Sequence, residues 1–214
     1  MSIDTPLTPN TLKISSVKRE HGKATLTLSN GEIRVMPRAL LRERPYKSGM
    51  AFDDDSFSRL LSERAYPFAM DKAVTLLSMR ARTEKELVQA LRRNAYPEEA
   101  IARVMQRLCE SGYINDSAFA SHFSSVRVSK GIGARRIRME LYQKGVSQET
   151  VDETLSSLDA DDMINGAIKV ARKASNGKNI HDRVDRQKIL AALARRGYDF
   201  QTSKIALEKL LETE

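Results

Sequence analysis

The 214-residue chain contains no Trp, and Cys109 is its only cysteine. A single cysteine cannot form an internal disulfide, which is typical of proteins of a reducing cytoplasm. No apolar run approaches the roughly 18 residues that span a membrane. The first ten residues, MSIDTPLTPN, lack the charged and apolar regions of a signal peptide. We therefore expect a cytoplasmic protein without a membrane partner.

Catalytic patterns are also missing. His21, His122 and His181 lie in unrelated contexts without the spacing of metal ligands, and no GxSxG or SxxK pattern marks a nucleophilic serine. The acidic clusters at residues 53–55 and 159–162 precede expected helices, where carboxylates complement the helix dipole. Cys109 is expected to be half-buried in a helix. These absences predict a protein that is not an enzyme and needs no metal or other cofactor.

Three segments of 26 residues align with one another without a gap. They begin at Thr83, Gly133 and Asp185, so consecutive copies are offset by 50 and 52 residues. Apolar residues coincide at four positions: Leu87, Ile137 and Ile189; Leu91, Leu141 and Leu193; Met105, Leu155 and Leu207; Leu108, Leu158 and Leu210. Apolar residues within each copy follow the i, i+3 and i+4 spacing of amphipathic helices. The alignment therefore predicts an internal repeat of helix pairs.

A short turn joins the two predicted helices of each copy. Gly145 and Gly197 stand where a left-handed residue ends many helices. Ala95 stands there in the first copy, where a side chain fits less comfortably. Ser147 and Asp199 are suitable N-caps for the second helix of their copies. Thr83 is expected to cap the first helix pair, as Gly133 and Asp185 begin the others.

A further apolar helical stretch precedes each pair, at residues 69–80, 116–128 and 162–174. The repeating unit is therefore expected to contain three helices and to occur three times, at residues 66–112, 113–158 and 159–214. Units of this kind stack on their neighbours. The predicted fold is mainly α, with three tandem three-helix repeats in an elongated, curved array.

Residues 11–36 alternate polar with apolar side chains, as half-buried strands do. Asn30-Gly31 is a strong hairpin signal. We expect two or three strands in a small antiparallel β region, followed by a short helix over about residues 53–64, and assign residues 1–65 to this region. Because the pattern changes there, a fragment beginning at residue 66 is expected to fold with high helicity.

Gly131 and Gly133 precede a basic segment and resemble a phosphate-binding loop at first sight. Such a loop needs a preceding strand and a GK[ST] or GxGxxG pattern, and the sequence has neither. Gly133 aligns with helix starts in the other copies. The two glycines are therefore expected to shape a helix entry.

The charge is positive and unevenly placed: the chain has a net charge of +8, and residues 101–150 carry eight basic and four acidic side chains. Such a balance favours an anionic partner, either nucleic acid or an acidic protein surface. The candidate contact residues are Arg80, Arg82, Arg127, Lys130, Arg135, Arg136, Arg138 and Lys144. The alternative is that long basic side chains only cover neighbouring helices. Few aromatic residues are available to stack on bases, which disfavours a dedicated single-strand binder.

Three stretches resemble the RecX family, regulators of the RecA recombinase: RARTEKEL at 80–87, GYINDSAFA at 112–120 and KGIGARRIRMELYQKGVS at 130–147. The similarity is strong over about residues 72–158 and weaker in the third repeat. The strand region is like that of longer family members only, and Ala95 departs from the Lys-Gly turn of the second repeat.

The resemblance implies tandem three-helix repeats and a function without catalysis. It implies binding to the RecA filament on single-stranded DNA, with lower ATPase and strand-exchange activity, and thereby regulation of recombination, DNA repair and the SOS response. A monomer is expected. The alternative is a DNA-binding protein acting alone, since three-helix units are similar to helix-turn-helix modules.

Overall fold

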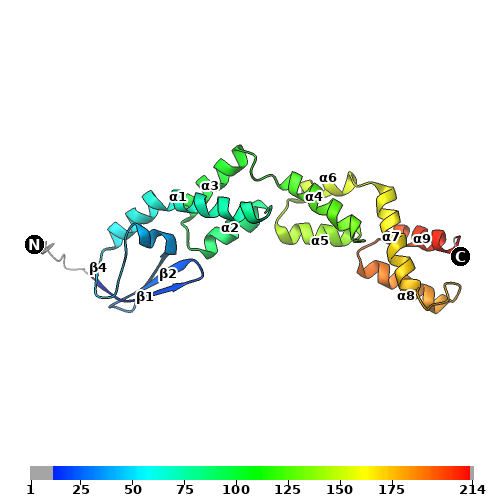
Figure 1. Cartoon of the computed structure of the whole chain (residues 1–214), viewed down its shortest axis with the longest axis horizontal. Coiled ribbons are helices and arrows are strands. Elements are labelled where there is room, and N and C mark those ends of the chain that lie inside the picture. Colours follow the sequence, from blue (N-terminus) through cyan, green and yellow to red (C-terminus); the bar gives the residue numbers. More distant parts are fainter. Residues whose placement is uncertain (1–11, 213–214) are drawn as a thin grey trace, which may run out of the picture. The chain divides into compact units, whose positions relative to one another are not determined.

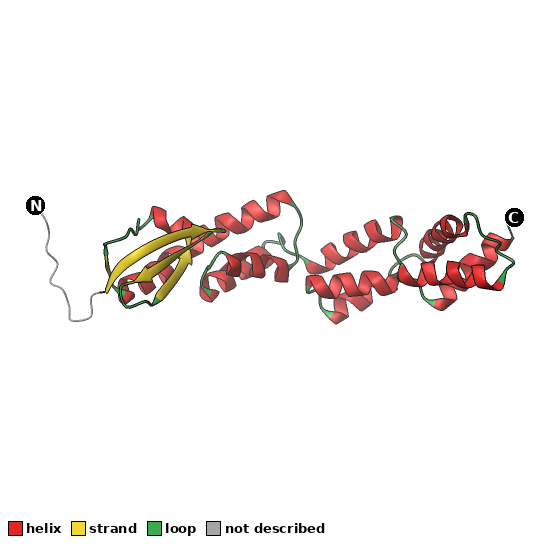
Figure 2. Cartoon of the chain, turned by 90° about the horizontal axis from the view of Figure 1, so that it is seen from below, coloured by secondary structure: helices red, strands yellow, loops and turns green. Residues whose placement is uncertain are grey.

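A computed structural model describes residues 12–212, so the first part of the expected strand region, residues 1–11, lies outside the described residues. Figure 1 labels the elements along the chain, and Figure 2 distinguishes helices from strands. The helices are α1 (Asp54–Met79), α2 (Glu84–Arg93), α3 (Glu98–Glu110), α4 (Asp116–Ser129), α5 (Ala134–Lys144), α6 (Gln148–Ser156), α7 (Ala160–Ser175), α8 (Arg183–Arg195) and α9 (Phe200–Leu211). None of these described helices is both long and apolar enough for a transmembrane span.

The chain forms two compact units, Met1–Ile114 and Asn115–Glu214. The first contains the strands and α1 to α3, and the second contains α4 to α9. The predicted mainly α fold with a small antiparallel β region is confirmed. Within the second unit, the third helix triplet α7–α9 forms its own apolar core, centred on Ala167, Ile189, Leu193 and Ala206.

Within the described residues, four strands form an antiparallel sheet in the order β3-β2-β1-β4. They are β1 (Leu12–Glu20), β2 (Lys23–Leu28), β3 (Ile33–Pro37) and β4 (Ala51–Phe52), and a short 3-10 helix, η1 (Arg38–Arg42), follows β3. Alternation in β2 places Ala24, Leu26 and Leu28 on the buried face, each at most 1% exposed. The prediction of a hairpin at Asn30-Gly31 is correct. The strand β4 was not predicted, because a strand of two residues shows no alternation of polar and apolar side chains.

The expected helices at 53–64 and 69–80 are one continuous helix, α1, which contains Pro67. Ala65, Ala69 and Ala73 are fully buried at a spacing of four residues, so one face of α1 packs into the core along its length. This packing compensates for the hydrogen bond that Pro67 cannot donate. The prediction of a helix break was wrong, and the boundary expected after residue 65 falls inside α1.

One apolar core joins the sheet to the first helix triplet. It includes Leu26 and Met36 of the sheet, Ala69 of α1, and Leu87 and Leu91 of α2. A fragment that begins at residue 66 would cut α1 and remove the sheet's share of this core. The strand region therefore belongs to the core of the first unit, contrary to the expected boundary, and the folding of such a fragment with high helicity stays a prediction.

The repeat alignment is confirmed by burial. The six residues at the two first-helix positions have no exposed surface, and they are Leu87, Leu91, Ile137, Leu141, Ile189 and Leu193. Thr83 caps α2 through its hydroxyl, which accepts a hydrogen bond from the Glu86 amide at 3.2 Å, and Gly133 is the N-cap of α5. The third copy differs, because Asp182 and not Asp185 caps α8.

Ala95 adopts the left-handed conformation expected of glycine, with a φ of 60°, where Gly145 and Gly197 have 89° and 90°. The following amide closes the same bond in each copy, from Tyr96 to Leu91, from Val146 to Leu141 and from Tyr198 to Leu193, at 3.3, 3.1 and 3.2 Å. The three turns are therefore equivalent, and Ala95 is held in a strained backbone conformation by the helices on either side of it.

Replacing Ala95 with Gly is expected to stabilise the protein by about 0.5–1 kcal/mol. The change removes the strain of an alanine in the left-handed conformation, about 1–2 kcal/mol. Part of this gain is lost because glycine raises the conformational entropy of the unfolded chain. Urea unfolding followed by circular dichroism measures the change. The reciprocal control, Gly145→Ala, should destabilise by a similar amount; stabilisation by both substitutions would contradict the equivalence of the turns.

Tyr96 and Tyr198 follow these turns, and burial raises the pKa of each phenol to about 12. The Tyr96 hydroxyl donates to the Phe68 carbonyl at 3.0 Å, whereas the Tyr198 hydroxyl has no hydrogen-bond partner among the described residues. At neutral pH, Tyr96→Phe should therefore cost roughly 0.5–1.5 kcal/mol, and Tyr198→Phe should be neutral or stabilising.

Alkaline pH provides a second measurement on the same two variants. The pKa of each phenol is about 12 in the folded protein and 10 in the unfolded chain, so the unfolded phenol ionises first as pH rises. Each neutral phenol therefore contributes its full stability below pH 10, and the protein loses this stability as pH rises toward 12. Each Phe variant should therefore lose less stability than the parent between pH 10 and 12. An unchanged pH dependence in both variants would contradict the burial of these phenols.

Candidate functional site

The expected basic surface begins at the two residues that precede α2. Arg80 is the C-cap of α1, and its guanidinium pairs with Glu86 at 2.8 Å. The Arg82 Nε donates to the Leu76 carbonyl at 3.2 Å, and burial lowers the Arg82 pKa. Both side chains therefore help to hold the α1–α2 connection in place.

Glu140 of α5 partly neutralises the candidate residues of the second repeat. Its carboxylate lies 2.7 Å from the Arg127 guanidinium and 3.2 Å from that of Arg136. The Arg127 guanidinium also lies over the Phe123 ring, 4.9 Å from its centre. Arg127 therefore packs between helices α4 and α5 and is only partly available to a partner.

Arg138 and Lys144 are also engaged within the second repeat. Arg138 forms an ion pair with Asp152 that joins α5 to α6. Its pKa is raised by hydrogen bonds to the Tyr142 hydroxyl and to Asp152. The Lys144 ammonium lies 5.5 Å from the ring centres of both Phe119 and Phe123, a cation–π arrangement.

Lys130 and Arg135 are the exposed remainder of the expected surface. Neither forms an ion pair with any residue between 12 and 212, and both flank the start of α5. Within the described residues, the structure thus separates the eight candidates into two exposed cations without an ion pair and six that form ion pairs, hydrogen bonds or ring contacts. Contact of any of them with a partner stays a prediction.

Gly131 and Gly133 form a close approach between the second and third repeats. A Cβ on Gly133 would lie 2.4 Å from the Gly197 carbonyl carbon and from the Tyr198 amide nitrogen. The Gly133 amide donates to the Arg196 carbonyl at 2.9 Å, and the Arg135 amide donates to the Gly197 carbonyl at 3.0 Å. The glycines are therefore junction residues, beyond the expected role in helix entry.

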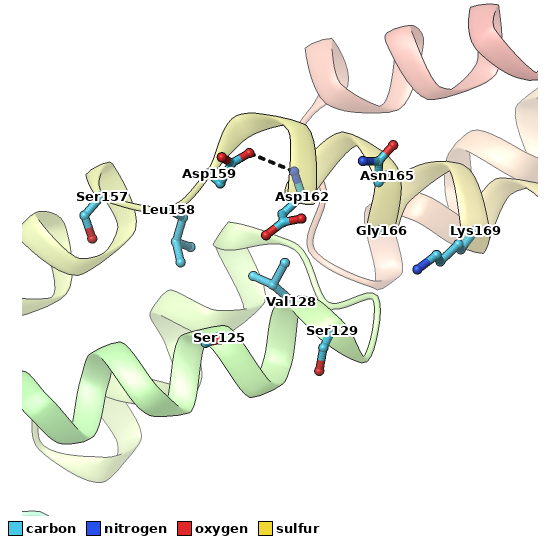
Figure 3. A pocket seen from close by; sticks show the side chains of 10 residues that line it. All are labelled: Ser125, Val128, Ser129, Ser157, Leu158, Asp159, Asp162, Asn165, Gly166 and Lys169. Carbon is cyan, nitrogen blue, oxygen red and sulfur yellow. Dashed lines mark hydrogen bonds between the residues drawn. The ribbon is translucent and has the colours of Figure 1, made fainter.

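The acidic and histidine residues gather into no metal site: residues 12–212 contain no group of three or more potential metal ligands. Asp159 caps α7 by accepting hydrogen bonds from the amides of Asp161 and Asp162, the second of which is drawn in Figure 3. Asp53 caps α1 by accepting a hydrogen bond from the Ser56 amide. Both clusters stabilise helix starts, as expected. Cys109 is exposed, so the expectation of a half-buried thiol was wrong.

A cleft of about 400 Å³ lies between α4 and the start of α7. Figure 3 shows the side chains that line it. Ser125 and Ser129 line one side, and Asp162, Asn165 and Lys169 line the other. The described residues of the cleft contain no nucleophile paired with a base. Its position between two repeats makes it part of their junction.

Comparison with known proteins identifies the family of this chain. The family description "RecX, first three-helix domain" matches residues 69–108, and "RecX, second three-helix domain" matches residues 115–155. A regulatory protein RecX of Chlorobium phaeobacteroides is 34% identical over 146 residues, which cover 68% of this chain and 95% of that protein. This chain belongs to the RecX family.

Other RecX proteins extend the match over most of the chain. The regulatory protein RecX of Mycolicibacterium vanbaalenii is 32% identical over 179 residues, covering 77% of this chain and 94% of that protein. A crystal structure of regulatory protein RecX has a TM-score of 0.64 at 21% identity, over 92% of this chain and 99% of that one. The chain therefore has the RecX fold, and its relatives are named as regulatory proteins.

Proposed function

We propose that this RecX-family chain is a non-enzymatic inhibitor of RecA that acts in the cytoplasm. It binds the RecA filament on single-stranded DNA and lowers the ATPase and strand-exchange activities, and in this way regulates recombination, DNA repair and the SOS response. The observation that carries the proposal is the match to both RecX three-helix domains together with relatives named as regulatory proteins. The basic, repeat-built body is compatible with a surface of acidic protein and phosphate.

The decisive experiment measures RecA ATPase on single-stranded DNA with and without this chain. A loss of ATPase that depends on the chain's concentration supports the proposal. Unchanged ATPase and strand exchange at saturating concentrations would contradict it. Tight binding to duplex DNA with a steep salt dependence, combined with no effect on RecA, would favour the alternative of a DNA-binding protein acting alone.

The exposed cations Lys130 and Arg135 give a sharper test of the contact surface. We expect the double variant Lys130→Ala and Arg135→Ala to inhibit RecA less strongly, because exposed charges mainly govern the rate of association. The inhibition that remains should depend less on salt concentration. The melting temperature should stay nearly unchanged, because neither side chain has an ion-pair partner among residues 12–212. The control is Arg138→Ala, which breaks the pair with Asp152 and should instead lower stability. Full inhibition by the double variant would assign this face to solubility.

A further inference from the structure

A second basic surface lies on the third repeat, around the ends of α7 and α8. Two hollows, of about 270 and 680 Å³, open there and share Lys173. Their exposed cations from the third repeat define the α7–α8 strip: Lys169, Arg172, Lys173, Arg195 and Arg196. Among residues 12–212, no aspartate or glutamate lines either hollow. The strip is therefore a local concentration of positive charge.

The five cations of the strip lie together without an acidic partner among the described residues. In the described residues, none of its five members forms an ion pair, whereas Arg34 pairs with Asp54 and Arg92 with Glu98, each at 2.7 Å. Asp161 and Asp162 lie in the first turn of α7, whereas Arg172 and Lys173 lie in its last turn. Cations gathered within a Debye length repel one another, and a bound polyanion relieves that repulsion.

The backbone holds the strip in one arrangement with the second repeat. The bonds from the Gly133 and Arg135 amides to the turn after α8 fix the start of α5 beside Arg196. Arg136 of α5 therefore lines the smaller hollow together with Lys173 and Arg195. Lys169 and Lys173 lie one helical turn apart on α7. Cations from three helices thus line one preformed surface.

A structural role accounts for only part of this arrangement. Arg172 and Lys173 lie in the last turn of α7, and Arg195 lies in the last turn of α8, where positive charge favours the helix dipole. That effect does not require cations from separate helices to face a common hollow. It also does not account for Arg136, which stands in the first turn of α5, where a positive charge is unfavourable, and which pairs there with Glu140 at 3.2 Å.

We propose that the α7–α8 strip binds the phosphodiester backbone of nucleic acid. Interfaces with nucleic acid are far more positively charged than those with protein, whose centres are apolar and aromatic. The lining contains no aromatic residue, and its apolar members are Val170 and two alanines. The described lining therefore offers no aromatic platform for bases, and contacts to phosphates make binding independent of base sequence. The proposal does not rest on RecA.

The test measures binding of the full chain to fluorescent single-stranded and duplex DNA by anisotropy, without RecA, over a range of salt concentrations. The variant carries Arg172→Gln, Lys173→Gln and Arg195→Gln. We expect its affinity to fall at least about tenfold and its salt slope to flatten by about three units, one for each lost phosphate contact. Two DNA sequences of the same length should bind equally well.

The matched control removes the same charges from the first unit, through Arg19→Gln, Arg42→Gln and Lys47→Gln. These exposed side chains form no ion pairs in the described residues. The control should bind DNA nearly as well as the parent, and equal losses in both triple variants would overturn the strip. Thermal melts followed by circular dichroism check that each variant is folded. If the triple variant of the strip is not folded, the single variant Lys169→Gln replaces it. Equally tight binding of poly-glutamate, lost in the same variant, would assign the strip to an acidic protein instead.

Failure of this proposal is distinguishable from failure of the RecA proposal. The DNA measurement contains no RecA, and the RecA ATPase measurement can be made with the same triple variant. A chain that inhibits RecA but binds no DNA by itself would overturn the strip and leave the RecA proposal standing. A chain that binds DNA through the strip but leaves RecA active would overturn the RecA proposal and leave the strip proposal standing.

Discussion

Replacing Leu91, Leu141 or Leu193 with Ala is expected to lower the free energy of unfolding by about 2–5 kcal/mol in each case. The three side chains occupy one position of the repeat, and none has exposed surface. Each substitution removes buried methyl groups and leaves a cavity, and close-packed neighbours fill such a cavity only partly. A similar loss at all three positions would reflect their shared place in the helix triplet.

Urea unfolding followed by circular dichroism measures these losses. The controls are Met139→Ala on α5 and Val184→Ala on α8, whose side chains are 59% and 57% exposed. Exposed positions of this kind usually change stability by less than about 0.5 kcal/mol. If the three leucine variants behave like these controls, the repeat alignment is wrong.

Gly133→Ala is expected to cost about 2–4 kcal/mol. The new methyl group would meet backbone atoms of Gly197 and Tyr198 at 2.4 Å, and backbone atoms cannot rotate away as a side chain can. Overpacking of this kind typically costs about 1–3 kcal/mol, and a lost hydrogen bond adds about 0.5–1.5 kcal/mol. The bonds at risk are those that the Gly133 and Arg135 amides donate across the junction.

The control for Gly133→Ala is Gly177→Ala, which separates steric contact from backbone strain. Gly133 has no positive φ, so its substitution tests contact alone. Gly177 has a φ of 72°, and no atom lies within 4 Å of the place that a Cβ would take, so its substitution tests strain alone, at about 1–2 kcal/mol. Amide chemical shifts of Gly197 and Tyr198 should change only in the Gly133 variant. Unchanged shifts there would contradict the close approach.

The helix repeat was predictable from the sequence because the same spacing of apolar residues occurs three times. Large aliphatic residues at the two first-helix positions recur in three copies, and a single coincidence would have carried little weight. The fusion of two expected helices into α1 was not predictable in this way. Its buried face consists of Ala65, Ala69 and Ala73, which give a weak hydrophobic signal, and Pro67 between them favours a break.

The basic surface was only partly predictable, for a related reason. Charge counts identify cations, but pairing depends on which carboxylate the fold brings close. Glu140 is close to Arg136 in sequence, yet it also pairs with Arg127, thirteen positions away on another helix. The α7–α8 strip combines residues from α7, α8 and the start of α5, so no local stretch of sequence reveals it.

The shared core of the first unit has a consequence for synthesis on the ribosome. Its buried residues extend from Ile14 to Ile114, so the sheet, which ends at Phe52, cannot complete its packing until the 62 residues from 53 to 114 have emerged. Contacts over such separations form slowly, because a long loop must close first. The core of the second helix triplet draws on residues from Phe119 to Met163 alone. During translation, the apolar face of the sheet therefore stays exposed until α3 has emerged, whereas the second helix triplet can pack within a much shorter stretch of chain.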